Sequence, residues 1–249
     1  MIINAICSIL FNMYLVIIVT TYGIFCLIIF PFLNNNLRYN LIRLWCRHFV
    51  SSANIICGIN YQIDGLEHLT KNYDKPIIIL SKHQSAWETV AFLGLFPKRL
   101  CFVFKRELLF IPFFGWVLGM LDMLHINRKY GIRAFAYLSK ETQIKLNKGY
   151  TPILFPEGTR ALPHQNIPYK SGGVRLAIQN NADIIPISHN AGEVWAKNSF
   201  IKKSGIINIH VGKPISSADK NMEELNTEVK NYIESHIVYN NTNFLQDLT

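Results

Sequence analysis

Hydrophobic residues dominate the first part of the chain without interruption by charge. No charged residue occurs between positions 2 and 37, and the stretch Ile9–Phe32 is almost continuously apolar. As a helix this stretch would extend for about 36 Å, enough to cross a hydrocarbon core of roughly 30 Å. A cleaved signal peptide would have a basic beginning and a shorter apolar region, which do not occur here. We therefore expect a membrane-anchoring helix.

A second, amphipathic segment follows at residues 38–50. Its arginines recur at spacings of five and four among apolar residues: Arg38, Arg43 and Arg47. This pattern is typical of a helix at a membrane interface, with the basic side chains at headgroup level. The turn-forming run Asn34–Asn36 would let the two segments fold back as a hairpin, so the first segment either spans the bilayer or enters one leaflet. Arginines after an apolar stretch favour a cytoplasmic position for the rest of the chain.

From Asn60 onward, short runs rich in β-branched residues alternate with helical patterns. The expected strands are 61–63, 76–80, 100–104, 152–155, 183–187 and 206–211, and the expected helices are 89–95, 130–147, 173–180 and 219–238. Strands that alternate with helices predict an α/β fold with a mixed, largely parallel sheet flanked by helices. We expect two parts: a membrane-anchoring pair of helices at 1–58 and a catalytic domain at 59–249.

The composition of the chain narrows the choice of partners. Half of the residues are hydrophobic, 16% are charged, and the net charge is +9, which indicates an anionic partner such as a lipid surface or a phosphorylated metabolite. Basic residues are scattered and not interleaved with aromatic residues, so we expect no nucleic-acid partner. The five cysteines form no C-x-x-C pair and the histidines show no ligand spacing, so we predict neither disulfides nor a metal site.

A histidine and a carboxylate stand five positions apart after the strand expected at 76–80. Five residues turn a helix through about 500°, so His83 and Glu88 can meet only if His83 precedes the helix and Glu88 lies in its first turn. Glu88 would then accept a hydrogen bond from Nδ1–H and leave Nε2 as a base, the division of labour found in catalytic triads. The alternative is a histidine that caps the helix.

The segment Phe155–Arg160, with the sequence Phe-Pro-Glu-Gly-Thr-Arg, leaves the end of another expected strand. Gly158 permits a turn that would present Glu157 and Arg160 to one side. Alone, this segment could equally be an ordinary turn between a strand and a helix. Ligand sites gather at strand ends in α/β sheets, so two such loops with charged side chains predict a site.

Together the two loops resemble the first and third signature motifs of the glycerolipid acyltransferase family, most closely the 1-acyl-glycerol-3-phosphate acyltransferases. Segments that resemble the family's other blocks follow in the family's order between Tyr61 and Pro214: Phe104–Leu108 with Pro112 and Gly115–Trp116, Gly119–Arg128, and Ile184–Ile187. The apolar N-terminus resembles the family's two-helix membrane motif. The first motif departs from the family at two positions, since Glu88 replaces the usual aspartate and Lys82 the frequent asparagine. A carboxylate is retained, so we expect its role to survive.

The resemblance implies a role for each matching residue. His83 would be the general base that deprotonates the free hydroxyl of lysophosphatidate, and Glu88 would orient it. The hydroxyl oxygen would attack the thioester of acyl-CoA or acyl carrier protein directly. Ser85 as a nucleophile is the competing idea, but it lacks a G-x-S-x-G elbow.

The resemblance also implies how substrate binds. Glu157 would hold the glycerol hydroxyl, and Arg160 would bind the phosphate in a bidentate manner. Gly158 and Thr159 belong to the same substrate-binding segment. Lys105 and Arg128 are further phosphate candidates, with solvated surface charge as the alternative explanation.

The predicted protein is thus an enzyme that makes phosphatidate at the cytoplasmic face of a membrane, the plasma or inner membrane if bacterial. It would need no cofactor, because the acyl donor is a substrate. Its partners would be a lysophospholipid, the bilayer, and acyl-CoA or acyl carrier protein. The alternatives are acylation of another lysophospholipid or of glycerol 3-phosphate, and a non-catalytic lipid-binding membrane protein.

Overall fold

The computed structural model of the chain describes residues 2–126 and 131–240. Its helices are α1 (Ile2–Ile29), α2 (Asn35–Cys57), α3 (Glu67–Thr70), α4 (Trp87–Leu95), α5 (Phe114–Gly119), α6 (Gly131–Asn147), α7 (Gly172–Gln179), α8 (Ala191–Val194) and α9 (Met222–Ser235), with the 3-10 turns η1 (Phe30–Phe32) and η2 (Arg106–Phe110). Its strands are β1 (Ile59–Asp64), β2 (Ile77–Ser81), β3 (Leu100–Lys105), β4 (Leu124–Ile126), β5 (Thr151–Leu154), β6 (Asp183–His189) and β7 (Gly205–Val211).

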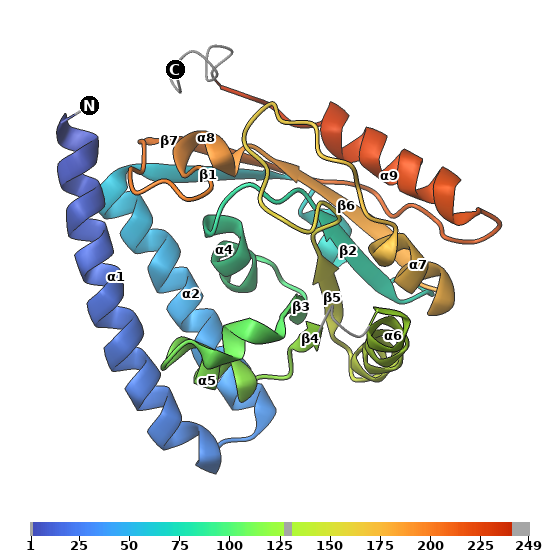
Figure 1. The fold of residues 1–249 in the computed structure, drawn as a ribbon, viewed down its shortest axis with the longest axis horizontal. Coiled ribbons are helices and arrows are strands. Elements are labelled where there is room, and N and C mark those ends of the chain that lie inside the picture. Colours follow the sequence, from blue (N-terminus) through green and yellow to red (C-terminus); the bar gives the residue numbers. More distant parts are fainter. Residues whose placement is uncertain (1, 127–130, 241–249) are drawn as a thin grey trace.

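The strands form one seven-stranded sheet in the order β1-β7-β6-β2-β5-β3-β4. All neighbours are parallel except β6 and β7, so the sheet is mixed and largely parallel. Helices α2 and α4 cover one face, and α6, α7 and α9 cover the other (Figure 1). Every residue of β2 is buried, as expected for a central strand with both faces covered. The predicted α/β fold is confirmed.

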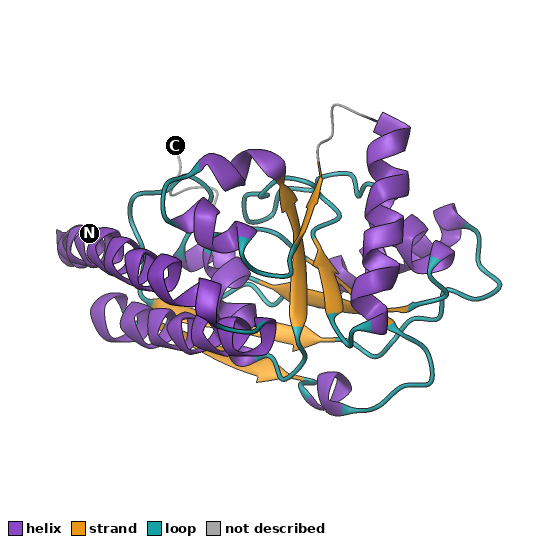
Figure 2. Cartoon of the chain, turned by 90° about the horizontal axis from the view of Figure 1, so that it is seen from below, coloured by secondary structure: helices purple, strands orange, loops and turns teal. Residues whose placement is uncertain are grey.

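The first two helices form an antiparallel pair along one side of the molecule (Figure 2). Asn34 caps α2 by accepting a hydrogen bond from the backbone N–H of Leu37, so the expected asparagine-rich turn is present. Helix α1 buries one stripe, from Ser8 through Phe11 and Gly23 to Cys26. Its other faces leave large apolar side chains exposed along the whole length, and exposed apolar surface of this extent marks contact with a membrane or partner.

Each of the three arginines of α2 donates a hydrogen bond to a backbone carbonyl. Arg43 donates to the carbonyl of Phe96 at 2.7 Å, and Arg47 donates to that of Gly94 at 3.0 Å. These carbonyls belong to the end of α4, where helical oxygens lack partners within the helix. Arg38 donates in the same way to the carbonyl of Phe30. The sequence pattern predicted headgroup contacts, whereas these guanidinium groups bind carbonyls of the protein itself.

Candidate active site

The two loops singled out in the sequence leave neighbouring strands of the sheet. Strands β2 and β5 are paired and parallel, so both end at the same edge. His83 lies two residues beyond β2, and the segment Phe155–Arg160 begins directly after β5. The backbone N–H of Ala161 donates to the carbonyl of His83 at 2.7 Å and joins the two loops.

His83 and Glu88 meet as the sequence requires. Helix α4 begins at Trp87, which places Glu88 in its first turn and His83 in the turn before it. The Nδ1 atom of His83 lies 2.8 Å from Oε1 of Glu88. The same oxygen accepts the backbone N–H groups of Gln84 and Ser85 at 3.0 and 2.9 Å. Oε1 of Glu88 therefore binds both the histidine ring and the backbone of the turn before α4.

Glu88 is completely buried. Burial alone would raise its pKa, but the imidazoles of His189 and His83 and the N–H of Ser85 outweigh that effect and hold the pKa of Glu88 below its ordinary value. The carboxylate is thus ionised at neutral pH. An ionised Glu88 holds the proton of His83 on Nδ1 and leaves Nε2 able to accept one.

The backbone and ring of His83 are also fixed. Its N–H donates to Oε2 of Glu157 at 2.7 Å. Its ring stacks on Phe155, with centroids 4.0 Å apart and planes at 15°. No hydrogen bond among the described residues engages Nε2, and His83 lines a pocket. The imidazole is therefore held with its second nitrogen toward a space that a substrate can enter.

Glu157 lies behind this loop and outside the lining of the pocket. It is buried, and its Oε1 lies 2.7 Å from Nζ of Lys82, while its Oε2 accepts the N–H of His83. Burial raises the pKa of Glu157 to about 6, against the opposing charge of Lys82. The resemblance implied contact with the glycerol hydroxyl, but in this structure both carboxylate oxygens face the protein.

Glycine is required in the turn that carries this segment. Gly158 has φ of +69°, in the left-handed region that favours glycine, and a Cβ there would lie 3.0 Å from Nζ of Lys170. The turn leaves Thr159 and Arg160 on the pocket wall, together with Gly158 itself. The three residues predicted to bind substrate therefore line the same pocket as His83.

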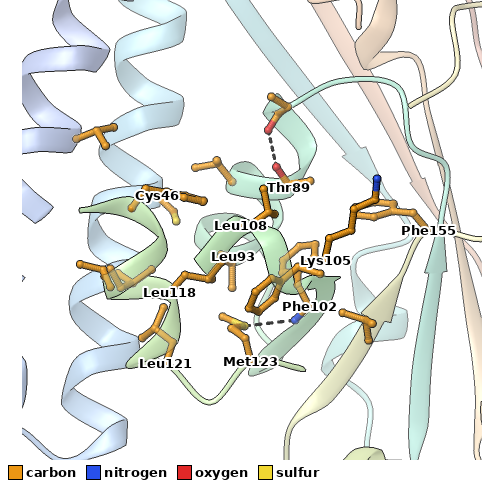
Figure 3. Close-up of a pocket in the computed structure, with 18 of the residues that line it drawn as sticks. Cys46, Thr89, Leu93, Phe102, Lys105, Leu108, Leu118, Leu121, Met123 and Phe155 are labelled. Carbon is orange, nitrogen blue, oxygen red and sulfur yellow. Dashed lines mark hydrogen bonds between the residues drawn. The ribbon is translucent and has the colours of Figure 1, made fainter. Parts of the chain in front are cut away.

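The pocket has a volume of about 560 Å³, within the usual range for ligand sites. Most of its wall is apolar and comes from α1, α2, α4, β3 and α5. Figure 3 shows the side opposite Phe155, where Leu118 and Leu121 of the α5 region face Cys46 of α2. The N-terminal helices thus form part of the wall of the same pocket that contains His83.

The charged side chains that line the pocket, among the described residues, are basic apart from the histidine: Lys105, Arg160 and Lys197. Lys197 donates to Oγ1 of Thr159 at 3.3 Å. Nothing in the sequence near Lys197 distinguished it from a surface lysine, since it lies in a loop outside every motif. Arg128, the remaining phosphate candidate, lies outside the described residues.

The described part of the chain also bears on metal binding and on membrane crossing. It contains no cluster of three or more histidine, cysteine, aspartate or glutamate side chains arranged to hold a metal. One helical stretch, Ile2–Phe32, is long and apolar enough to cross a membrane.

Comparisons with known proteins agree on one family. The family model described as Acyltransferase matches residues 60–190. The 1-acyl-sn-glycerol-3-phosphate acyltransferase of Pseudomonas aeruginosa is 38% identical over 84% of this chain and 80% of its own length. The human 1-acyl-sn-glycerol-3-phosphate acyltransferase alpha is 29% identical over 70% of this chain and 60% of its length.

The fold also has a solved counterpart. The crystal structure of the 1-acyl-sn-glycerophosphate (LPA) acyltransferase from Thermotoga maritima superposes with a TM-score of 0.76 over 93% of both chains, at 21% identity. The similarity covers the N-terminal helices as well as the sheet.

Proposed function

The chain belongs to the acyltransferase family, and on this premise we propose that it transfers an acyl chain from a thioester to the free hydroxyl of 1-acyl-sn-glycerol 3-phosphate, giving phosphatidate. The observation that carries the proposal is that His83, paired with Glu88, lines a largely apolar pocket whose other charged lining residues are basic. An apolar wall suits an acyl chain, and basic side chains suit a phosphate.

In the proposed mechanism Nε2 of His83 takes the proton of the acceptor hydroxyl as its oxygen attacks the thioester carbon. Glu88 stabilises the imidazolium that forms, and general-base assistance of this kind contributes about 10² to 10⁴ in rate. The thiolate of the donor leaves, and the proton on His83 can pass to it. Ser85 is a poor nucleophile here, because its Oγ accepts the backbone N–H of Trp87 in the turn of α4.

Arg160 and Lys105 are the proposed phosphate ligands, and Lys197 joins them on the strength of its position in the pocket wall. A guanidinium binds phosphate through two parallel hydrogen bonds, whereas a lysine acts as a point charge. Glu157 acts in this proposal through His83, since its Oε2 fixes the backbone N–H of the base.

We further propose that α1 and α2 attach the enzyme to one leaflet of the bilayer. Helix α1 is tied sideways to the catalytic domain, because Nζ of Lys202 donates to Oδ1 of Asn12 at 2.6 Å and the N–H of Lys202 donates to Oγ of Ser8 at 2.8 Å. At its other end α1 approaches α5, where a Cβ on Gly23 would meet Cβ of Phe113 at 2.8 Å. A helix held along its length by the domain lies beside it, with its exposed apolar faces in lipid.

The test is thiol release from palmitoyl-CoA or from palmitoyl acyl carrier protein, with lysophosphatidate, by detergent-purified protein. Wild type and His83→Ala are compared, with His68→Ala as the matched control because His68 lies outside the pocket lining. Release that needs the acceptor, survives in His68→Ala and disappears in His83→Ala supports the proposal. Wild-type turnover in a folded His83→Ala variant refutes the mechanism, and release only with glycerol 3-phosphate or another lysophospholipid refutes the assigned acceptor.

A further inference from the structure

The residues on either side of His83 are both polar and both completely buried. Lys82 and Gln84 have no exposed surface, although each carries a long side chain that usually lies in solvent. The backbone continues the direction of β2 here, since the N–H of Lys82 donates to the carbonyl of Ile187 at 2.9 Å. Side chains alternate along extended backbone, so His83 faces the pocket while its two neighbours face away from it.

On that opposite side Lys82 contacts the C-terminal helix α9. Its Nζ lies 2.7 Å from Oε1 of Glu234 and equally close to Oε1 of Glu157. The hydroxyl of Tyr169 donates to the same oxygen of Glu234 at 2.8 Å. The charges of Glu157 and Glu234 raise the pKa of Lys82, although its burial acts in the opposite direction. Lys82 is thus a buried cation shared between the loop of Glu157 and α9.

Gln84 contacts the chain just beyond α9. Its Nε2 donates to the hydroxyl of Tyr239 at 3.1 Å, and its Oε1 accepts the backbone N–H of Gly192 at 3.1 Å. The hydroxyl of Tyr239 also accepts the backbone N–H of His164, and the two rings lie 4.0 Å apart. Both neighbours of the base are therefore bonded to one short stretch, residues 234–239.

This stretch is itself attached to the sheet. Oγ of Ser188 in β6 donates to the carbonyl of His236 at 3.0 Å. The N–H of Asn240 donates to Oε2 of Glu193 in α8 at 2.8 Å, and Nδ2 of Asn208 in β7 donates to Oδ1 of Asn240. A segment attached at several points can hold the neighbours of His83 against a fixed frame.

We propose that Glu234 and Tyr239 are positioning residues for His83, acting through Lys82 and Gln84. The inference rests on the proposed function, in which His83 is the base. Glu234 keeps Lys82 centred between two carboxylates and so keeps Oε2 of Glu157 on the N–H of His83. Tyr239 holds Gln84, whose N–H donates to Glu88. A base displaced by about 1 Å loses rate by as much as 10²-fold. Glu234 and Tyr239 lie outside the pocket lining, so we expect substrate affinity to be retained.

The experiment compares Glu234→Ala and Tyr239→Phe with two controls in α9. Glu228→Ala removes a carboxylate that pairs with Lys220 at the surface, and Tyr232→Phe removes a hydroxyl that bonds His210. We expect about a tenfold lower kcat in each test variant, with KM for lysophosphatidate and palmitoyl-CoA within twofold of wild type. Both controls should retain wild-type kcat.

A second readout does not need turnover. The N–H groups of residues 83–85 donate to Glu157 and Glu88, so their hydrogen–deuterium exchange, followed in a peptide covering residues 82–88, reports how firmly the loop is held. We expect faster exchange there in both test variants and unchanged exchange in the controls.

Unchanged exchange at residues 82–88 overturns the proposal, as does a loss of kcat no greater than in the controls. A wild-type protein that transfers no acyl group would instead contradict the proposed function, and the exchange measurement then decides alone whether Glu234 and Tyr239 position His83.

Discussion

Glu88→Gln is the substitution that separates the charge of the carboxylate from its geometry. Oε1 of Glu88 accepts three N–H donors, from Nδ1 of His83 and from the backbone of Gln84 and Ser85, whereas Oε2 has no hydrogen-bond partner among the described residues. A glutamine of the same length can keep its carbonyl oxygen on the three donors and place its amide nitrogen at the position of Oε2. The turn and the tautomer of His83 then persist, and only the negative charge is lost.

The cost of losing that charge follows from the distance. Nδ1 and Oε1 are 2.8 Å apart, which places the charge centres of an imidazolium and a carboxylate about 4 Å apart. At an effective dielectric constant of about 20, their attraction is about 4 kcal/mol. Each 1.36 kcal/mol is tenfold in rate, and the retained hydrogen bond recovers part of the loss. We therefore expect kcat to fall by about 10² to 10³.

The assay is the initial rate of thiol release from palmitoyl-CoA with lysophosphatidate, together with the unfolding temperature of each variant in detergent. Glu67→Gln is the control, because Glu67 lies 3.6 Å from Nε2 of His68 at an exposed position. A folded Glu88→Gln variant with kcat within fivefold of wild type would show that the charge of Glu88 does not stabilise the transition state.

Four further predictions follow from the site and from the exposed apolar face of α1. Arg160→Lys keeps the charge but loses bidentate binding, so KM for lysophosphatidate should rise about tenfold in steady-state kinetics. Leu118→Trp fills the apolar wall opposite Phe155, so the ratio of kcat/KM for palmitoyl-CoA to that for octanoyl-CoA should fall at least tenfold. Val16→Lys places a charge on the exposed apolar face of α1, where Val16 is 68% exposed, and should weaken vesicle binding in flotation assays by at least tenfold, whereas Thr227→Lys on α9 should not. Burial raises the pKa of Glu157 from 4.5 to about 6, so the folded chain binds a proton on this carboxyl more tightly than the unfolded chain does. The protonated carboxyl therefore stabilises the fold most below pH 4.5, and this stabilisation is lost as pH rises through 6. Between pH 4.5 and 6 the free energy of unfolding, measured by thermal unfolding, should therefore change by about 1–2 kcal/mol more in wild type than in Glu157→Gln.

The long elements were predictable because each has a strong local pattern. The strands expected at 76–80, 183–187 and 206–211 differ from β2, β6 and β7 by no more than two residues at either end. The three-residue strand β4 and the short helices α3, α5 and α8 were not predicted, since they bury too few residues to produce a periodicity. The C-terminal helix, predicted at 219–238, is shorter at both ends. Asn221 caps α9 before Met222, and the helix ends at Ser235.

In the site, too, contacts between residues close in the sequence could be predicted, and contacts between distant residues could not. The contact between His83 and Glu88 could be predicted because it joins residues five apart, whose geometry depends only on where a helix begins. The contact between Lys82 and Glu234 joins residues 152 apart and depends on how α9 packs on the sheet. The carbonyl partners of Arg38, Arg43 and Arg47 could not be predicted for a related reason. A basic stripe on a helix looks the same whether it faces lipid headgroups or the carbonyl end of a neighbouring helix.

The sequence predicted two parts, residues 1–58 and 59–249. We propose that this boundary separates the part that contacts the membrane from the part that does not, and that both parts fold as one unit. Helix α2 ends at Cys57 and β1 begins at Ile59, yet the core is continuous across this point. Phe11 of α1 and Phe49 of α2 both pack on Trp195, with ring centroids 5.8 and 6.1 Å apart. Residues of α1 and α2 also line the pocket that contains His83. A domain without these helices would expose core aromatic residues and lose part of its pocket wall. Under the proposed function, the helices proposed to bind the bilayer would therefore also line the pocket that takes the acyl chain.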